Sequence, residues 1–214
     1  MFITTQNSKD KQYYEKMLRI AGSLSNLFSD SPQPYIGYRL AENLFCKTFH
    51  ADNLSRSDCS VDASKDGVGI GIKTFLYKNG KTFEKIAEFN RELNLFKGLD
   101  AEGVITKISE LRNQRIDFTK RNYLLKQVIY HSVVRSAGRI SVYESPMDQI
   151  DIGKISGVNQ KGNTISFKDG ANDYKFSISK STLFKQFIAE SPLLTCDVKI
   201  IDSPFEALEK MMED

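Results

Sequence analysis

Asp62 and Lys73 are the residues of this chain whose types and spacing most clearly suggest chemistry. They lie eleven positions apart in the segment DCSVDASKDGVGIGIKTFL, residues 58–76. An aspartate can hold a divalent cation, which polarises a phosphate and acidifies a bound water. Lys73 interrupts an apolar run, where its ammonium is unfavourable unless it finds an acid or a cleft. Two strands joined by a short turn would bring the two side chains together, which indicates metal-assisted phosphate chemistry.

The elements around this pair are predicted to be a helix, two strands and a further helix. Residues 38–49 carry an apolar stripe at helical spacing, with Glu42 beside it. Residues 59–63 and 68–76 are predicted as short strands, and the second is nearly continuous in apolar residues and glycine, which favours a central place in a sheet. Apolar residues at steps of three and four over residues 82–96 predict the second helix.

This arrangement resembles the PD-(D/E)XK nuclease superfamily, which includes most type II restriction endonucleases. The resemblance covers residues 38–96 and implies Mg²⁺-dependent hydrolysis of DNA phosphodiester bonds, most simply by a type II restriction endonuclease. Asp62 and Lys73 match the hairpin aspartate and the strand lysine of the family's site. Glu42 lies where the preceding helix often supplies a glutamate. The resemblance implies that Glu42 and Asp62 hold the metal, while Lys73 orients water or stabilises developing charge.

Gly71 departs from the family pattern, which usually places Asp or Glu two residues before the lysine. The second metal ligand is therefore open: Glu42 can compensate, as in family members that carry this carboxylate on a helix, and Glu88 and Asp58 are weaker substitutes. Gly71 also favours an alternative function, a non-catalytic DNA-binding module on a degenerate nuclease fold. A protein-interaction domain is a third interpretation.

Basic residues in the second half of the chain indicate a surface for double-stranded DNA, although the sequence does not separate DNA from RNA. Residues 111–126 mix arginine and lysine with asparagine and glutamine, the types that contact phosphates and base edges; a solvated helix face explains this run equally well. Residues 175–185 are basic without an acid and are predicted to lead into a helix N-terminus, which attracts anions. The candidate DNA-contacting residues are Lys81, Lys85, Arg112, Arg115, Lys120, Arg121, Lys175, Lys180, Ser181 and Lys185.

The rest of the pattern mixes helices and strands, so the predicted fold class is α/β or α+β, with a mixed central β-sheet flanked by helices as in restriction endonucleases. Residues 124–134 fit either a helix or a strand. Other helices are predicted at residues 10–28, 101–113, 181–189 and 205–212, and other strands at residues 139–144, 151–158, 164–167, 174–178 and 195–201. We expect a single domain over residues 1–214, with nuclease-like core motifs at about 35–100 and a DNA-contacting half at about 110–200.

The composition excludes several other classes. Apolar runs are too short for a membrane span, and the charged residues near the start leave no apolar core for a secretory signal. Three widely spaced cysteines exclude a disulfide framework, and two histidines exclude a histidine-rich metal site. His131 lies among apolar residues and is expected to be structural. We therefore expect a cytoplasmic protein, with a homodimer as a possible assembly.

Overall fold

The chain, described by a computed structural model over residues 1–213, divides into two compact units. Unit 1 comprises Met1–Tyr77, Tyr123–Met147 and the described residues from Ala189 onward, and unit 2 comprises Lys78–Asn122 and Asp148–Ile188. Each unit therefore contains segments that are far apart in the sequence. Residues 35–100, which carry the nuclease-like motifs, contribute to both units.

Unit 1 contains a six-stranded mixed sheet. Its order is β1-β2-β3-β5-β6-β11. β3 and β5 are parallel, while the other neighbours are antiparallel. This confirms the predicted mixed α and β fold class. The strand bounds are Asp52–Asn53 for β1, Ala63–Lys65 for β2, Val68–Leu76 for β3, Gln127–Ser136 for β5, Arg139–Pro146 for β6 and Leu194–Asp197 for β11.

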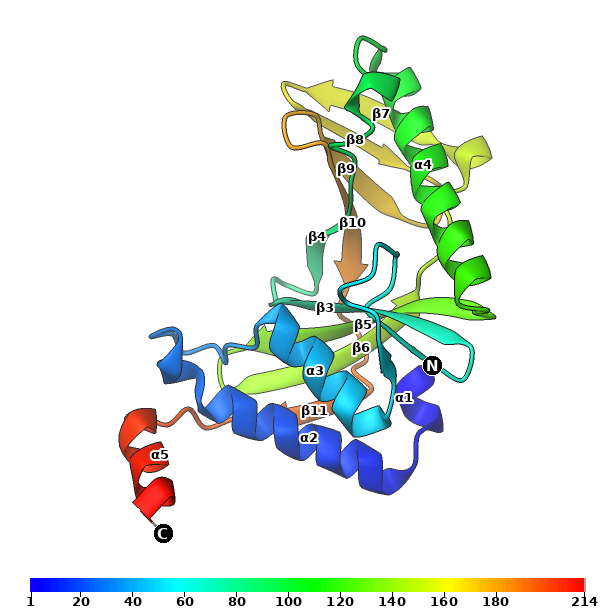
Figure 1. Cartoon of the computed structure of the whole chain (residues 1–214). Helices are drawn as coiled ribbons and strands as arrows, with labels where there is room; N and C mark the ends of the chain where they lie inside the picture. Colours follow the sequence, from blue (N-terminus) through cyan, green and yellow to red (C-terminus); the bar gives the residue numbers. More distant parts are fainter. Residues whose placement is uncertain (214) are drawn as a thin grey trace. The chain divides into compact units, whose positions relative to one another are not determined.

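Two helices of unit 1, α2 and α3, pack against this sheet (Figure 1). Phe45 and Phe49 of α3 join Ile70 and Ile72 of β3 in one buried apolar cluster, because the helical and strand periods each direct one stripe inward. No helix among residues 1–213 is long and apolar enough to cross a membrane. The helices of unit 1 are α1 (Phe2–Thr5), α2 (Ser8–Ser23), η1 (Ser25–Leu27), α3 (Tyr38–Phe49) and α5 (Pro204–Glu213).

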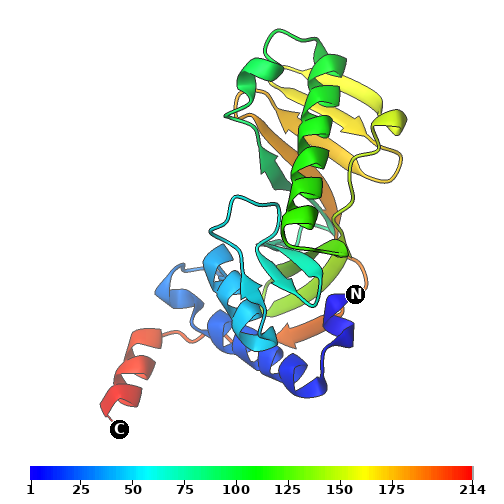
Figure 2. The ribbon, with the colours of Figure 1, turned by 45° about the vertical axis from the view of Figure 1, so that its right-hand side comes forward.

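Unit 2 contains a five-stranded antiparallel sheet, with α4 (Ala101–Asn122) lying against one face (Figure 2). Ile105 and Ile108 of α4 share a buried cluster with Phe167 and Phe176 of the sheet. The strand order is β4-β10-β9-β8-β7, with bounds Lys81–Glu88 for β4, Thr182–Ile188 for β10, Asp173–Ser177 for β9, Thr164–Lys168 for β8 and Ser156–Lys161 for β7. Two short 3-10 helices, η2 (Leu93–Leu95) and η3 (Ile152–Lys154), complete this unit.

The helix predicted over residues 82–96 is wrong, because most of this segment is the strand β4. β4 pairs with β10 with a bulge: Phe184 faces Lys85 and Leu183 faces Ala87, so Ile86 is the extra residue. A bulge shifts the two-residue alternation by one position. The apolar residues on both sides of the bulge therefore fall at spacings of three and four, which imitates a helix.

The helix predicted over residues 181–189 is also wrong, because β10 occupies most of it. Leu183 and Phe187 point to the face that α4 covers, and Lys185 lies between them on that same face. A lysine at a buried strand position hides the alternation. Apolar residues at 183, 184, 187 and 188 then give an apparent helical stripe.

Other expected elements are present with shifted ends. The helix expected over residues 38–49 is confirmed as α3, and the ambiguous residues 124–134 belong mostly to the strand β5. The helix predicted at residues 101–113 extends to Asn122. The strand expected at residues 59–63 is instead β2, which begins at Ala63.

A buried hydrogen-bond network joins three distant parts of unit 1. His131 is fully buried, and its Nδ1 lies 3.0 Å from Glu144 Oε1 while its Nε2 lies 3.0 Å from the Tyr14 hydroxyl. The Glu144 carboxylate also accepts from Ile3 N–H at 3.1 Å, so we infer that Nδ1 carries the proton and Nε2 accepts from Tyr14. Burial raises the pKa of Tyr14, which keeps its hydroxyl a donor. The expectation that His131 is structural is confirmed.

Tyr14→Phe should lower the free energy of unfolding by about 1–3 kcal/mol, because it leaves the buried Nε2 of His131 without a donor. Urea denaturation measures this change. Tyr13→Phe is the matched control, since Tyr13 is its exposed neighbour on the same helix. Equal effects of the two substitutions would contradict a stabilising role for the network.

Candidate functional site

Three elements of unit 1 bring the predicted catalytic residues into one electrostatic cluster. Glu42 lies on α3, Asp62 immediately precedes β2, and Lys73 lies on β3. Asp62 raises the pKa of Glu42, and Lys73 in turn lowers the pKa of Asp62, so each pair is close enough to interact. The structure therefore brings together three residues that the sequence places up to thirty-one positions apart.

The hairpin of β2 and β3 fixes the position of Asp62. The Asp62 N–H donates to the Ile70 carbonyl at 2.8 Å, and the Ile72 N–H donates to Asp62 Oδ2 at 2.7 Å. The carboxylate is thus held by the backbone of the strand that carries Lys73. Lys73 is half-buried, with Nζ 6.0 Å from the centre of the Tyr130 ring.

Arg39 is a member of the cluster that the sequence analysis missed. It lies one turn before Glu42 on α3 and donates to Glu42 Oε2 at 3.0 Å and to Ser55 Oγ at 2.9 Å. Its charge also lowers the pKa of Asp62. The three-residue spacing on a predicted helix was the signal that could have found it, since such pairs are neighbours on the helix surface.

Both carboxylates are harder to ionise than usual. Glu42 is only 5% exposed, and burial raises its pKa most, with the negative charge of Asp62 adding to the effect. Burial also raises the pKa of Asp62, against the opposing effects of Ile72 N–H, Lys73 and Arg39. Acids whose pKa values are raised by burial and by neighbouring charges are a common feature of functional sites.

Gly71 stands where the nuclease family usually has an acid, and a side chain here would meet the end of Met147. It lies on the same face of β3 as Lys73, two positions away. A Cβ at this position would lie 2.5 Å from Cε of Met147 and 3.3 Å from Cδ1 of Tyr130. Because this nearest atom is the end of a flexible methionine, a side chain at this position would require mainly that Met147 move. Glycine carries no carboxylate, so a second metal ligand would come from another element, and Glu42 of α3 is one such residue.

The other two acids considered as substitutes are placed differently. Glu88 lies in unit 2, at the end of β4, where it pairs with Lys85 at 2.8 Å. Asp58 lies in unit 1 but is exposed; burial raises the pKa of the neighbouring Cys59 thiol, and the charge of Asp58 adds to this effect. Glu42 is thus the acid that the geometry of the Asp62 site favours.

The two carboxylates suit a magnesium ion that takes its other ligands from phosphate and water. Mg²⁺ is usually bound by one or two carboxylates together with substrate phosphates, rather than by a full protein cage. Burial and the charge of Asp62 raise the pKa of Glu42, and Arg39 opposes this effect. Burial raises the pKa of Asp62, and Lys73 and Arg39 oppose it. A bound cation would stabilise both carboxylates further. Within residues 1–213, no group of three or more His, Cys, Asp or Glu side chains could hold a metal by itself.

All ten residues predicted to contact DNA lie in unit 2, whereas the catalytic candidates lie in unit 1. The ten residues predicted to contact DNA differ in their exposure to solvent. Lys81, Lys85, Arg121, Lys175 and Lys180 are exposed, and Lys120 is half-buried near the end of α4. Ser181 is buried in the turn before β10, not at a helix N-terminus.

Three of the predicted basic residues are buried in unit 2 or make contacts within it. Arg112 and Lys185 are only 3% and 7% exposed. Burial lowers the pKa of Lys185, an effect that the carboxylates of Asp148 and Asp169 oppose. Arg115 lies over the Phe89 ring at 4.6 Å and pairs with Glu92 at 2.7 Å. Their burial and internal contacts favour a structural role over phosphate contact.

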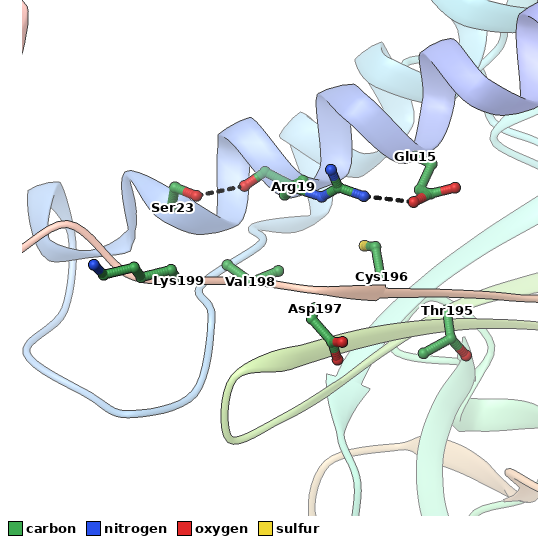
Figure 3. A pocket seen from close by; sticks show the side chains of 8 residues that line it. All are labelled: Glu15, Arg19, Ser23, Thr195, Cys196, Asp197, Val198 and Lys199. Atoms are coloured by element: carbon green, nitrogen blue, oxygen red, sulfur yellow. Dashed lines mark hydrogen bonds and ion pairs between the residues drawn. The ribbon is translucent and has the colours of Figure 1, made fainter.

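A separate pocket in unit 1 lies between α2 and β11 (Figure 3). Its acids are paired: Glu15 accepts from Arg19 at 2.6 Å, and Asp197 accepts from Arg139 at 2.9 Å. Burial raises the pKa of the Cys196 thiol to about 11, so it stays protonated at neutral pH. Among its lining residues, all of which the structure describes, there is thus no unpaired acid or ionised thiol, so this pocket is a less suitable candidate for catalysis than the Asp62 site. Its lining residues are Glu15, Arg19, Ser23, Thr195, Cys196, Asp197, Val198 and Lys199.

The chain matches no protein-family model, no curated protein and no solved structure. The assignment of a function therefore depends on the residues and geometry described above.

Asp62→Asn should increase the free energy of unfolding at pH 7. The carboxyl has a higher pKa in the folded state, so the folded protein binds the proton more tightly and loses stability as pH rises from about 3.9 through the raised value. Asparagine removes the charge and keeps an oxygen for Ile72 N–H. The gain should shrink near pH 3, where the aspartate is protonated in both states. Urea denaturation at both pH values measures it.

Asp52→Asn is the matched control, because Asp52 is an exposed acid of unit 1 on the neighbouring strand β1. It should change stability little at either pH. An Asp62→Asn variant that is less stable than the wild type at pH 7 would show that the contacts of Asp62 with Lys73 and Arg39 outweigh its desolvation.

Proposed function

We propose that unit 1 carries a Mg²⁺-dependent phosphodiesterase site and that the protein is a DNA endonuclease of the type II restriction class. The observation that carries this proposal is the convergence of Glu42, Asp62 and Lys73 from a helix, a hairpin and a central strand. Two acids with raised pKa values beside a lysine form a group suited to a cation and a phosphate. The resemblance to the PD-(D/E)XK superfamily supplies the reaction and DNA as the substrate.

In this proposal each residue of the cluster has a defined role. Glu42 and Asp62 would hold the Mg²⁺, which when bound polarises the phosphate and acidifies a water. Ile72 N–H orients the Asp62 carboxylate. Burial leaves both carboxylates poorly solvated, so a bound cation would stabilise their negative charge. Lys73 places a positive charge beside Asp62, where it can stabilise charge that develops on the phosphate. Arg39 neutralises Glu42 until a cation binds.

A non-catalytic DNA-binding module is the second candidate function, and two observations favour it. Gly71 removes the usual acid, and Met147 fills the space beside it. In addition, Arg39 already pairs with Glu42, so a fixed cation is supplied by the protein itself. In this alternative the cluster of Arg39, Glu42, Asp62 and Lys73 is a structural remnant of the site.

Cleavage of plasmid DNA in Mg²⁺ should fall about a hundredfold or more in Asp62→Asn, which loses a metal ligand, and in Lys73→Ala, which loses a positive charge at the phosphate. Glu42→Gln should lose nearly as much, since Gly71 leaves Glu42 as the second ligand. The measurement is the initial rate of cleavage with folding checked by circular dichroism. A loss below about tenfold in Glu42→Gln would exclude it as the second ligand, and specific binding of DNA without cleavage by the wild type would support the non-catalytic module.

Mg²⁺ should also raise the thermal unfolding midpoint of the wild type without DNA, because a ligand that binds only the folded state stabilises it, by about 2.7 kcal/mol at one hundred times its dissociation constant. Asp62→Asn should abolish this shift, whereas the control Asp52→Asn should keep it. Equal shifts in the wild type and Asp62→Asn would place the cation elsewhere.

A further inference from the structure

One face of the five-stranded sheet of unit 2 points away from α4 and is not covered by that helix. Within residues 78–122 and 148–188, all of which the structure describes, α4 is the only α-helix, and it packs on the face that carries Phe167, Phe176 and Leu183. We call the opposite face the open face and define it by the cross-strand pairs Phe184 with Lys85, Phe184 with Lys175, and Ser166 with Lys175.

The strand register places five lysines on the open face. Lys81 and Lys85 alternate with the inward residues of β4, and Lys175 does so on β9. Lys168 pairs across from Asp173, and Lys161 pairs across from Thr164. All five are exposed. The strand acids of this face are Glu88 and Asp173, which pair with Lys85 at 2.8 Å and with Lys168 at 3.1 Å. The face therefore keeps a surplus of positive charge.

The centre of the open face is partly apolar, and a lysine lies over one of its aromatic rings. Lys175 extends across β10 and places Nζ 4.1 Å from the centre of the Phe83 ring on β4. A cation over an aromatic face is held in place without losing its charge. Phe184 lies between the two strands on β10 and is half-buried. Because Lys175 covers Phe83, this ring positions an ammonium rather than offering a surface for base stacking.

The lysines extend from one edge of the sheet to the other. β4 and β7 are the edge strands, four strand spacings apart, and at about 4.8 Å each this is roughly 19 Å. The major groove of B-DNA is about 12 Å wide. Lysines at the two edges can therefore reach phosphates of both strands of a duplex, whereas a single strand presents only one row of phosphates. Asn159 and Gln186, on the same face, add groups able to contact base edges.

We propose that the open face is the surface by which this protein binds duplex DNA. This inference rests on the proposed function for the choice of DNA as the partner. The lysines of β4, β7, β8 and β9 contact the phosphates, and the Lys175 ammonium held over Phe83 contacts them at the centre. The exposed residues of α4, including Arg121, then lie on the opposite side of unit 2 and do not contact the duplex.

This inference is tested by measuring how tightly the full chain binds a fluorescent DNA duplex at several salt concentrations. EDTA is present, so that binding is measured without cleavage. Lys175→Ala and Lys161→Ala should each weaken binding and make the slope of log affinity against log salt shallower by about one, the effect of one lost phosphate contact. Circular dichroism and thermal unfolding show that each variant is folded, which is expected for exposed side chains.

Lys85→Ala and Lys107→Ala form a matched pair for the same experiment. Each lysine pairs with a glutamate three residues later, at 2.8 Å and 2.9 Å, but Lys85 lies on the open face and Lys107 on α4. Only Lys85→Ala should weaken binding. Equal affinities of the wild type and the open-face variants, or weaker binding in Lys107→Ala and Arg121→Ala instead, would overturn the inference.

The remaining outcomes separate this inference from the proposed function. Binding through the open face by a wild type that does not cleave DNA in Mg²⁺ would support the inference and contradict the nuclease. Cleavage that the open-face variants retain in full would support the nuclease and overturn the inference. Tighter binding of a single-stranded probe that depends on the same lysines would contradict the duplex as the partner.

Discussion

The parallel pairing of β3 with β5 is the constraint on which the rest of this structure depends. A parallel neighbour requires a long crossover, because the chain must return to the starting edge of the sheet. Here the crossover contains β4, η2 and α4, and the later connection between β6 and β11 contains β7 to β10. β4 pairs with β10, so the sheet of unit 2 forms only when both connections meet. Unit 2 is thus made of two chain segments, each of which lies in the sequence between two strands of the unit 1 sheet.

The same strand, β3, controls the electrostatics of the candidate site. Its backbone N–H at Ile72 holds Asp62, and its next residue, Lys73, supplies the opposing charge. Burial nevertheless raises the pKa of both acids, so ionised carboxylates reduce the stability of the fold. Two such acids close together therefore cost stability. Their position beside two cationic side chains is the physical argument for function at this place, and it depends on no similarity to another protein.

The sequence allowed the prediction of α3, of β3 and of the charge interaction between Asp62 and Lys73, because each depends on local periodicity or on a short hairpin. It did not allow the prediction of β4 and β10. A bulge at Ile86 shifted the alternation of one strand, and the buried Lys185 masked it in the other. The contact of Arg39 with Glu42 follows from their three-residue spacing on α3, whereas its contact with Ser55 depends on a loop that the periodicity does not place. The division into two units could not be predicted, since it depends on the pairing of strands about one hundred residues apart.

The distribution of basic residues shows why the count of charges in a sequence is a poor guide to a binding surface. Residues 111–126 and 175–185 carry similar basic runs, yet Arg112 and Lys185 are directed into unit 2, where Asp148 and Asp169 oppose the desolvation of Lys185. These charges are buried, so a polyanion at the surface gains little from them. On the open face the alternation of β8 and β9 directs Lys168 and Lys175 outward while Phe167 and Phe176 of the same strands form the core. The two-residue period of a sheet, rather than local charge density, therefore decides which basic residues remain available for DNA.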